Sequence, residues 1–209
     1  MIGFYNYTVI LTYIGATCAM LGMFNAMEGN ANWALLFLML AGLCDMFDGT
    51  VAKTRKRTVQ EKRFGIQIDS LADLICFGVL PSIVGYSFIK GTCSNPIYYA
   101  VLIAFTLCAL IRLAYFNVCE EERQQTTTES RKYYEGMPVT TVALILPLVY
   151  SFRDYMGDYI TPVYFVCLAI IALLFVLKFK IVKLKMKGML GLLVVGVLEF
   201  IWYMVEFKK

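Results

Sequence analysis

Long apolar stretches alternate with short polar segments along almost the whole chain. Each stretch is close to the roughly 20 residues that an α-helix needs to cross the hydrocarbon core of a bilayer. The pattern predicts an all-α polytopic membrane protein with about six to eight transmembrane helices, formed by residues 1–209 as a single domain. We expect the spans at residues 7–27, 32–52, 66–89, 97–118, 138–152, 160–177 and 188–206.

The two C-terminal regions of this pattern differ from the rest. The fifth stretch is short and contains Pro138 and Pro147, and the seventh follows a Lys-rich segment. The seventh is either an additional C-terminal spanning helix, at about 188–206, or a peripheral one.

Composition and charge placement support this reading and predict an orientation. Hydrophobic residues make up 60% of the chain and charged residues only 16%, too little polar surface for a soluble domain of this size. Fourteen of the 19 Lys and Arg residues lie in the segments 53–65, 119–137 and 178–187. Since cytoplasmic loops carry an excess of Lys and Arg, we expect these segments in the cytoplasm. The net charge of +4 reflects this orientation rather than nucleic-acid binding.

The residue types that are missing or unpaired also limit the chemistry. The chain has no histidine, which removes imidazole bases, histidine metal ligands and histidine-containing catalytic triads. Its seven cysteines form no C-x-x-C pair and are interpreted as small buried hydrophobic residues. Any polar chemistry inside the membrane must therefore come mainly from carboxylates.

Four aspartates flank the first basic loop. Asp45 and Asp48 are three residues apart near the end of the second span, and Asp69 and Asp73 are four residues apart near the start of the third. Each pair shares one helix face. On two antiparallel helices joined by one loop, all four carboxylates would lie at matching depth, roughly 6–12 Å below the loop at 1.5 Å per residue.

Four clustered carboxylates in a low dielectric need cations, because each charge is costly there and like charges repel. Without histidine or paired cysteine, hard Mg²⁺ or Mn²⁺ ions are the natural partners, and two bridged ions suit displacement at phosphorus. Gly49, Ala52 and Gly65 leave room for a ligand beside the aspartates. Two other readings stay open: ion pairs of single aspartates with Lys or Arg, and the acidic pathway of a divalent-cation carrier.

The order of these residues resembles a known signature. The chain reads D-x2-D-G-x2-A-K, eleven further residues, then G-x3-D-x3-D, which is similar to D-x2-D-G-x2-A-R-x8-G-x3-D-x3-D of the CDP-alcohol phosphatidyltransferases. Two departures are visible. Lys53 stands where the family usually has Arg, and the gap before Gly65 is three residues longer. Lys lacks the bidentate fork of Arg, and Arg55 offers an alternative phosphate contact.

Three further segments resemble the phosphatidylserine synthases within this family. They are FGIQIDSLADLICFGVLPS around the last two aspartates, RLAYFNV at 112–118 and YEGMPVTTVA at 134–143. The resemblance runs from about Tyr7 to Pro147. It implies a six-helix core that transfers a phosphatidyl group from CDP-diacylglycerol to L-serine, giving phosphatidylserine and CMP. It further implies membrane-lipid contacts, a homodimer and a prokaryotic cytoplasmic membrane, with the active site facing the cytoplasm.

The resemblance also assigns roles to individual residues. All four aspartates would hold two Mg²⁺ or Mn²⁺ ions, and Asp73 would also act as the general base. The CDP-diacylglycerol site would be lined by Asp48, Gly49, Ala52, Lys53, Arg55 and Gly65.

The acceptor site is inferred from two polar residues of the fourth apolar stretch. Arg112 lies within a predicted span, where an unpaired cation is expensive. It binds either the serine carboxylate or, as an ion-pair partner, an aspartate or a glutamate of the 119–122 run. Asn117 is either a second serine contact or part of a helix-end hydrogen bond. A sister transferase that uses glycerol-3-phosphate or inositol phosphate is the alternative function.

Overall fold

The computed structural model describes the chain apart from residues 1–2, 5, 92–94, 127–132, 183–185 and 208–209. In the described part, five helices are long and apolar enough to cross a membrane: Tyr7–Met27, Ala31–Ala52, Val59–Ile89, Pro96–Arg123 and Arg153–Val176. Two shorter apolar helices, Val139–Ser151 and Val194–Val205, accompany them. The predicted class, an all-α polytopic membrane protein, is confirmed.

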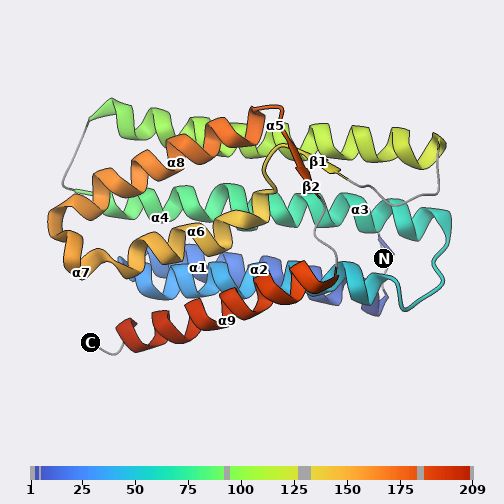
Figure 1. The fold of residues 1–209 in the computed structure, drawn as a ribbon, viewed down its shortest axis with the longest axis horizontal. Helices are drawn as coiled ribbons and strands as arrows, with labels where there is room; N and C mark the ends of the chain where they lie inside the picture. Colours follow the sequence, from blue (N-terminus) through green and yellow to red (C-terminus); the bar gives the residue numbers. More distant parts are fainter. Residues whose placement is uncertain (1–2, 5, 92–94, 127–132, 183–185, 208–209) are drawn as a thin grey trace.

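The helices lie largely along the long axis of the molecule (Figure 1). In chain order the elements are η1 (Tyr7–Val9), α1 (Ile10–Met27), α2 (Ala31–Ala52), α3 (Val59–Asp73), η2 (Leu74–Val79), α4 (Leu80–Ile89), α5 (Pro96–Thr126), β1 (Tyr133–Glu135), η3 (Val139–Thr141), α6 (Val142–Ser151), α7 (Arg153–Met156), η4 (Gly157–Tyr159), α8 (Ile160–Val176), β2 (Lys180–Val182) and α9 (Met186–Phe207).

The loop that follows α2 is shorter than expected, because α3 begins at Val59 rather than after Gly65. The backbone N–H of Glu61 donates to the Thr58 hydroxyl at 3.2 Å, and the Thr58 N–H donates to the Glu61 carboxylate at 2.8 Å. This reciprocal pair is a capping box, which satisfies two backbone donors at a helix start. The loop therefore spans only residues 53–58, and the polar segment after it forms the first turns of α3.

A π-helical segment, η2, connects α3 and α4 into one continuous span. It begins at Leu74, directly after Asp73, and is followed by Pro81 in the first turn of α4. Proline has no backbone N–H to continue the hydrogen-bond ladder, and π segments are frequent at functional sites. The irregular turns thus lie immediately beyond the last aspartate.

Small residues allow the helices to approach one another closely. A Cβ added to Gly22 of α1 would lie 3.1 Å from the Leu80 side chain and 3.2 Å from the Ala34 carbonyl oxygen, and one added to Gly42 of α2 would lie 2.6 Å from the Ala143 Cβ. Such contacts are typical of helix packing in membranes, where van der Waals contact replaces the hydrophobic effect. They hold α2 between α1 and α6.

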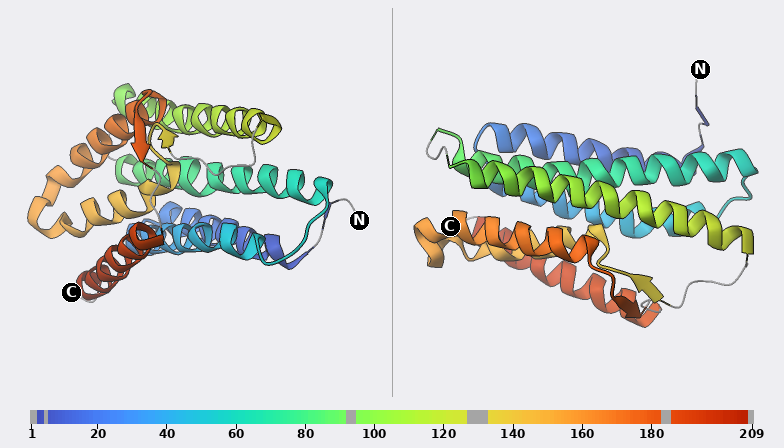
Figure 2. Two further views of the ribbon diagram at one scale, coloured as in Figure 1. Left: turned by 45° about the vertical axis from the view of Figure 1, so that its right-hand side comes forward. Right: turned by 90° about the horizontal axis from the view of Figure 1, so that it is seen from above.

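The outer layer is formed by the C-terminal half of the chain. Helix α8 packs on α5, whereas α9 crosses beside α6 and α2 (Figure 2). The Tyr203 hydroxyl on α9 donates to the backbone carbonyl of Asn32 at 3.0 Å. The seventh apolar stretch therefore packs on the bundle through part of α9.

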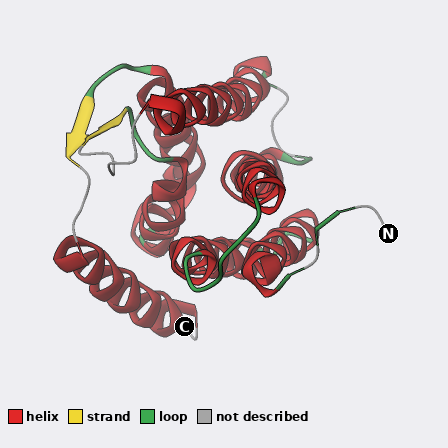
Figure 3. Cartoon of the chain, turned by 90° about the vertical axis from the view of Figure 1, so that its right-hand side faces the viewer, coloured by secondary structure: helices red, strands yellow, loops and turns green. Residues whose placement is uncertain are grey.

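A short antiparallel strand pair is an addition to the all-helical expectation. Strand β1 pairs with β2, with Tyr134 opposite Ile181. The view along the helices places this pair at one side of the bundle (Figure 3). Gly136, which follows β1, has a φ of +74°, a conformation that glycine adopts without a Cβ penalty. The pair joins the two polar segments that follow α5 and α8.

Candidate active site

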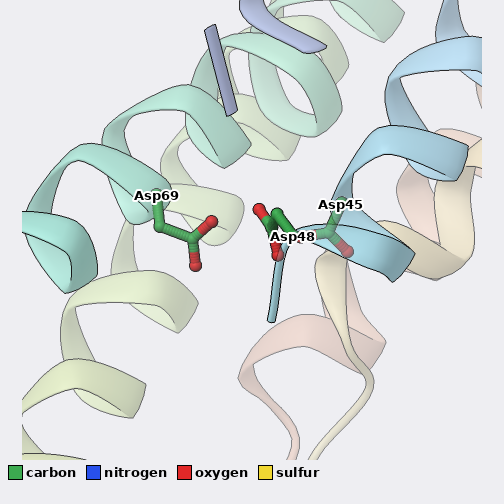
Figure 4. A group of neighbouring side chains, drawn as sticks. All are labelled: Asp45, Asp48 and Asp69. Carbon is green, nitrogen blue, oxygen red and sulfur yellow. The ribbon is translucent and has the colours of Figure 1, made fainter. Parts of the chain in front are cut away.

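Three aspartates converge from the two helices that flank the basic loop. Asp45 and Asp48 extend from α2 and Asp69 extends from α3, and one carboxylate oxygen of each lies within 4.8 Å of the others. Figure 4 shows the side chains directed into one space between the helices. All three are half-buried.

Asp73 completes the group from the next turn of α3. Its carboxyl group lies within hydrogen-bonding reach of that of Asp45, while the carboxyl groups of Asp48 and Asp69 are within reach of each other. The quartet thus consists of two carboxyl pairs that each join α2 to α3. The structure brings together the four aspartates that the spacing grouped, and their roles as metal ligands and base stay predictions.

The surroundings of Asp48 are polar on one side and open on the other. The buried Thr12 hydroxyl of α1 donates to the Asp48 carboxylate at 3.5 Å. A Cβ added to Gly49 would meet no atom within 4 Å, and Gly49 is exposed. Half-buried Ala52 follows one turn later. The helix surface at Gly49 is therefore open, whereas the Arg57 guanidinium covers Gly65, and a ligand site at these residues stays a prediction.

Asn117 connects a third helix to the site. The Ser70 hydroxyl of α3 donates to the Asn117 side-chain oxygen of α5 at 3.0 Å. Ser70 directly follows Asp69, so the bond fixes α5 against α3 at the level of the carboxylates. Sequence reasoning offered serine binding or a helix-end hydrogen bond for Asn117; the observed contact is a bond between two helices.

Arg112 is buried, with 6% of its surface exposed. Its Nε donates to the backbone carbonyl of Met137 at 3.1 Å, and its guanidinium lies 5.8 Å from the centre of the Phe116 ring. Together with Lys178, Arg112 also lines a cavity between α5 and the end of α8. Part of its function is therefore structural: it holds the segment before η3 against α5.

The cations of the basic loop differ in their environments. Lys53 is exposed, and the Arg55 guanidinium lies 3.5 Å from the Glu61 carboxylate at the start of α3. Arg57, which sequence reasoning did not single out, turns back toward the motif glycine. Its Nη1 lies 3.0 Å from the position of a Cβ added to Gly65. The spacing of charges along the sequence could not predict the direction of the Arg57 side chain.

An apolar cavity of about 390 Å³ lies between α2, α6 and α9 and reaches Asp45. Its apolar lining includes Met39, Leu43, Ala143, Leu144, Val197 and Phe200. Thr140 and Thr141, from the segment that was aligned with the family, lie at its polar end. The cavity thus joins a lipid-like environment to one of the carboxylates.

The aspartates fit a hard divalent cation by their chemistry. All donors are carboxylate oxygens, which suit Mg²⁺ or Mn²⁺. Two oxygens on one Mg²⁺ lie at most about 4.2 Å apart, given bonds of about 2.1 Å. The three carboxylate oxygens, all within 4.8 Å of one another, lie close to that range.

Fold and site together define an integral membrane protein with a carboxylate centre between two spans. The chain belongs to the CDP-alcohol phosphatidyltransferase family, whose sequence model matches residues 5–198. The family membership inferred from the motif is therefore confirmed.

Curated relatives carry related names. The chain is 39% identical over 120 residues to a CDP-diacylglycerol–serine O-phosphatidyltransferase of Saccharomyces cerevisiae, covering 56% of this chain and 41% of the relative. It is 31% identical over 143 residues to an archaetidylserine synthase of Methanothermobacter thermautotrophicus, covering 68% and 56%. A CDP-diacylglycerol–serine O-phosphatidyltransferase of Helicobacter pylori is 31% identical over 144 residues, covering 69% and 56%. The matches span about half the length of these relatives.

The quartet predicts a measurable cation site. Asp48→Asn or Asp69→Asn should weaken Mn²⁺ binding to the purified protein at least tenfold, because each change removes an anionic ligand from the cluster. Free Mn²⁺ can be followed by electron paramagnetic resonance during titration. Asp158→Asn, an exposed aspartate outside the cluster, is the control and should bind as the unmodified chain does. Equal affinity of all variants would contradict a cation site at the quartet.

Proposed function

We propose that this chain transfers the phosphatidyl group of CDP-diacylglycerol to L-serine, releasing CMP and forming phosphatidylserine. The observation that carries the proposal is the convergence of the four motif aspartates between two membrane helices of a CDP-alcohol phosphatidyltransferase. Serine is supported by the names of the relatives, which differ in the lipid but share this headgroup.

The metal centre would be formed by Asp45, Asp48, Asp69 and Asp73, holding two Mg²⁺ or Mn²⁺ ions. When bound, the ions supply positive charge that neutralises the diphosphate and stabilises the leaving phosphate. The residues' own contribution is preorganisation. Each carboxyl pair joins α2 to α3, so the ligands are placed before the substrate arrives.

Asp73 is assigned as the general base. It is the last aspartate of the motif, is half-buried and directly precedes the π segment. As the serine hydroxyl oxygen forms its bond to phosphorus, Asp73 accepts the hydroxyl proton and the bond from phosphorus to the CMP oxygen breaks. A positioned base of this kind contributes about 10²–10⁴-fold in rate.

The lipid part of the substrate fits the apolar cavity beside Asp45. An acyl chain that lies between α2, α6 and α9 would bring the diphosphate to the carboxylates, beside the open surface at Gly49 and Ala52. The apolar lining also limits water, which would otherwise compete with serine as nucleophile.

Orientation and assembly remain part of this proposal. The excess of Lys and Arg in the basic segments supports a site at the cytoplasmic face, and we propose that the membrane is the cytoplasmic membrane of a prokaryote. We further propose a homodimer, as implied by the family resemblance.

The activity is tested with the full chain in lipid vesicles that contain CDP-diacylglycerol and Mn²⁺. We expect CMP release with L-serine, and little release with glycerol-3-phosphate or inositol phosphate. Excess chelator should abolish release, and Ca²⁺ should restore it poorly because it prefers longer bonds and more ligands. CMP and the lipid product are measured together.

Three outcomes would contradict parts of the proposal. Full CMP release in chelator contradicts the metal-dependent mechanism, and CMP release with another alcohol supports the sister transferase. Cation uptake without CMP release supports a carrier.

Asp73→Asn separates the base from the binding site. It should abolish serine-dependent CMP release while CDP-diacylglycerol binding changes little, because the change removes a base and only one of several ligands. Turnover is measured in vesicles and lipid binding by competition with a labelled CDP-lipid. Turnover close to that of the unmodified chain would show that another group accepts the proton.

Arg112→Ala tests the proposed serine contact. If its guanidinium also binds the serine carboxylate, KM for serine should rise at least tenfold while KM for CDP-diacylglycerol changes much less. Thermal unfolding in detergent serves as the parallel measurement, since the bond to the Met137 carbonyl predicts some loss of stability. A loss of stability with equal changes in both KM values would instead assign Arg112 a structural role alone.

A further inference from the structure

One cation of the basic loop is partly withdrawn from solvent, unlike its neighbours. Lys53, Arg55 and Lys56 are exposed, whereas Arg57 is half-buried. The Arg57 Nε is buried and has no hydrogen-bond partner among the described residues. A buried donor without an acceptor destabilises the folded chain, because its hydrogen bond to water is lost and not replaced. Since a loop cation could turn to water at little cost, its inward position needs an explanation.

The other loop arginine is held by the helix cap. Arg55 pairs with Glu61, whose carboxylate also accepts the Thr58 N–H at 2.8 Å and the Asn6 side-chain amide at 3.4 Å. This network fixes Arg55 on the outer side of the α3 start. Arg55 is therefore occupied, and the chain turns back before Arg57.

The position of Arg57 relative to the aspartates is set by α3. Its Nη1 lies over Gly65 at 3.0 Å from the added Cβ position. Gly65 precedes Asp69 by four residues and so shares its helix face, with a rise of about 6 Å between them. The guanidinium consequently lies at the loop edge of the same face that carries Asp69 and Asp73. Any larger residue at position 65 would displace it.

The chemistry of this placement points to an anion with two adjacent oxygens. A guanidinium binds phosphate through two parallel N–H bonds, which a lysine ammonium cannot do. Bound cations at the quartet would attract a diphosphate, and Arg57 lies over Gly65, on the α3 face that also carries Asp69 and Asp73. The spacing from Lys53 to Gly65 is three residues longer than in the family signature, and Arg57 is the loop cation that lies over Gly65.

We propose that the Arg57 guanidinium forms a bidentate contact with the diphosphate of the CDP-lipid. Arg57 would thereby replace the arginine that the family has at the position of Lys53. This inference rests on the proposed function, because the diphosphate belongs to that substrate. It assigns Arg57 a substrate-binding role that neither charge spacing nor the motif indicates.

The test compares single substitutions in the full chain, in detergent with Mn²⁺, using CDP as the probe. Arg57→Ala should weaken CDP binding at least tenfold, and the loss should persist at high salt because the contact is desolvated. The adjacent exposed cation provides the matched control: Lys56→Ala removes the same charge and should change CDP binding less than twofold. Equal behaviour of Arg57→Ala and Lys56→Ala overturns the assignment.

A second variant distinguishes loss of the contact from misfolding. Arg57→Lys keeps the charge and the aliphatic stem but removes the bidentate guanidinium group. It should therefore retain the thermal unfolding temperature and still weaken CDP binding severalfold. CDP affinity unchanged in Arg57→Lys would overturn bidentate binding even if Arg57→Ala could not be purified.

The vesicle assay separates this inference from the proposed function. Serine-dependent CMP release by the unmodified chain, with Arg57→Ala equal to Lys56→Ala, would refute only the role of Arg57. Arg57-dependent CDP binding without any serine-dependent CMP release would refute the proposed function and leave the role of Arg57 supported. Absence of CDP binding by the unmodified chain would refute the role of Arg57, and CMP release in vesicles would still decide the proposed function.

Discussion

The mutual repulsion of four carboxyl groups in a low-dielectric region is the constraint on which this structure depends. Asp45 and Asp48 face Asp69 and Asp73 across the gap between α2 and α3. Such a cluster is expensive without protons or cations, so the surrounding fold must hold the two helices together against it. Close packing holds α2 elsewhere along its length: an added Cβ would lie 3.2 Å from the Ala34 carbonyl oxygen at Gly22 of α1 and 2.6 Å from the Ala143 Cβ at Gly42.

The same packing connects the polar centre to the membrane. Because Gly42 lets α6 approach α2, the segment that begins at Pro138 lies beside Asp45, and α9 closes the other wall of the apolar cavity. The long span from Val59 to Ile89 changes to a π segment immediately after Asp73. The site is thus bounded by an apolar cavity on one side and an irregular helix below. Both features suit a reaction in which a lipid-borne group must reach a charged centre.

The loop between α2 and α3 combines two kinds of electrostatic function. Its exposed cations can interact with the membrane surface and set the orientation of the chain. The capping box of Thr58 and Glu61 starts α3 early and binds Arg55, which leaves Arg57 to turn toward Gly65. The three residues added to the family spacing lie in this segment, in which Arg57 lies over the motif glycine.

The sequence by itself determined the fold class, the approximate spans and the grouping of the aspartates, because these follow from hydropathy and helical periodicity, which are local properties. The start of α3 was also encoded locally, in a capping box that the hydropathy pattern obscured. The tertiary structure alone decided the bond between Ser70 and Asn117, the contact of Arg112 with Met137, the strand pair and the apolar cavity. It also decided the direction of Arg57. These features depend on which helix faces meet and where a loop turns, and such contacts between distant residues leave no periodic trace in the chain.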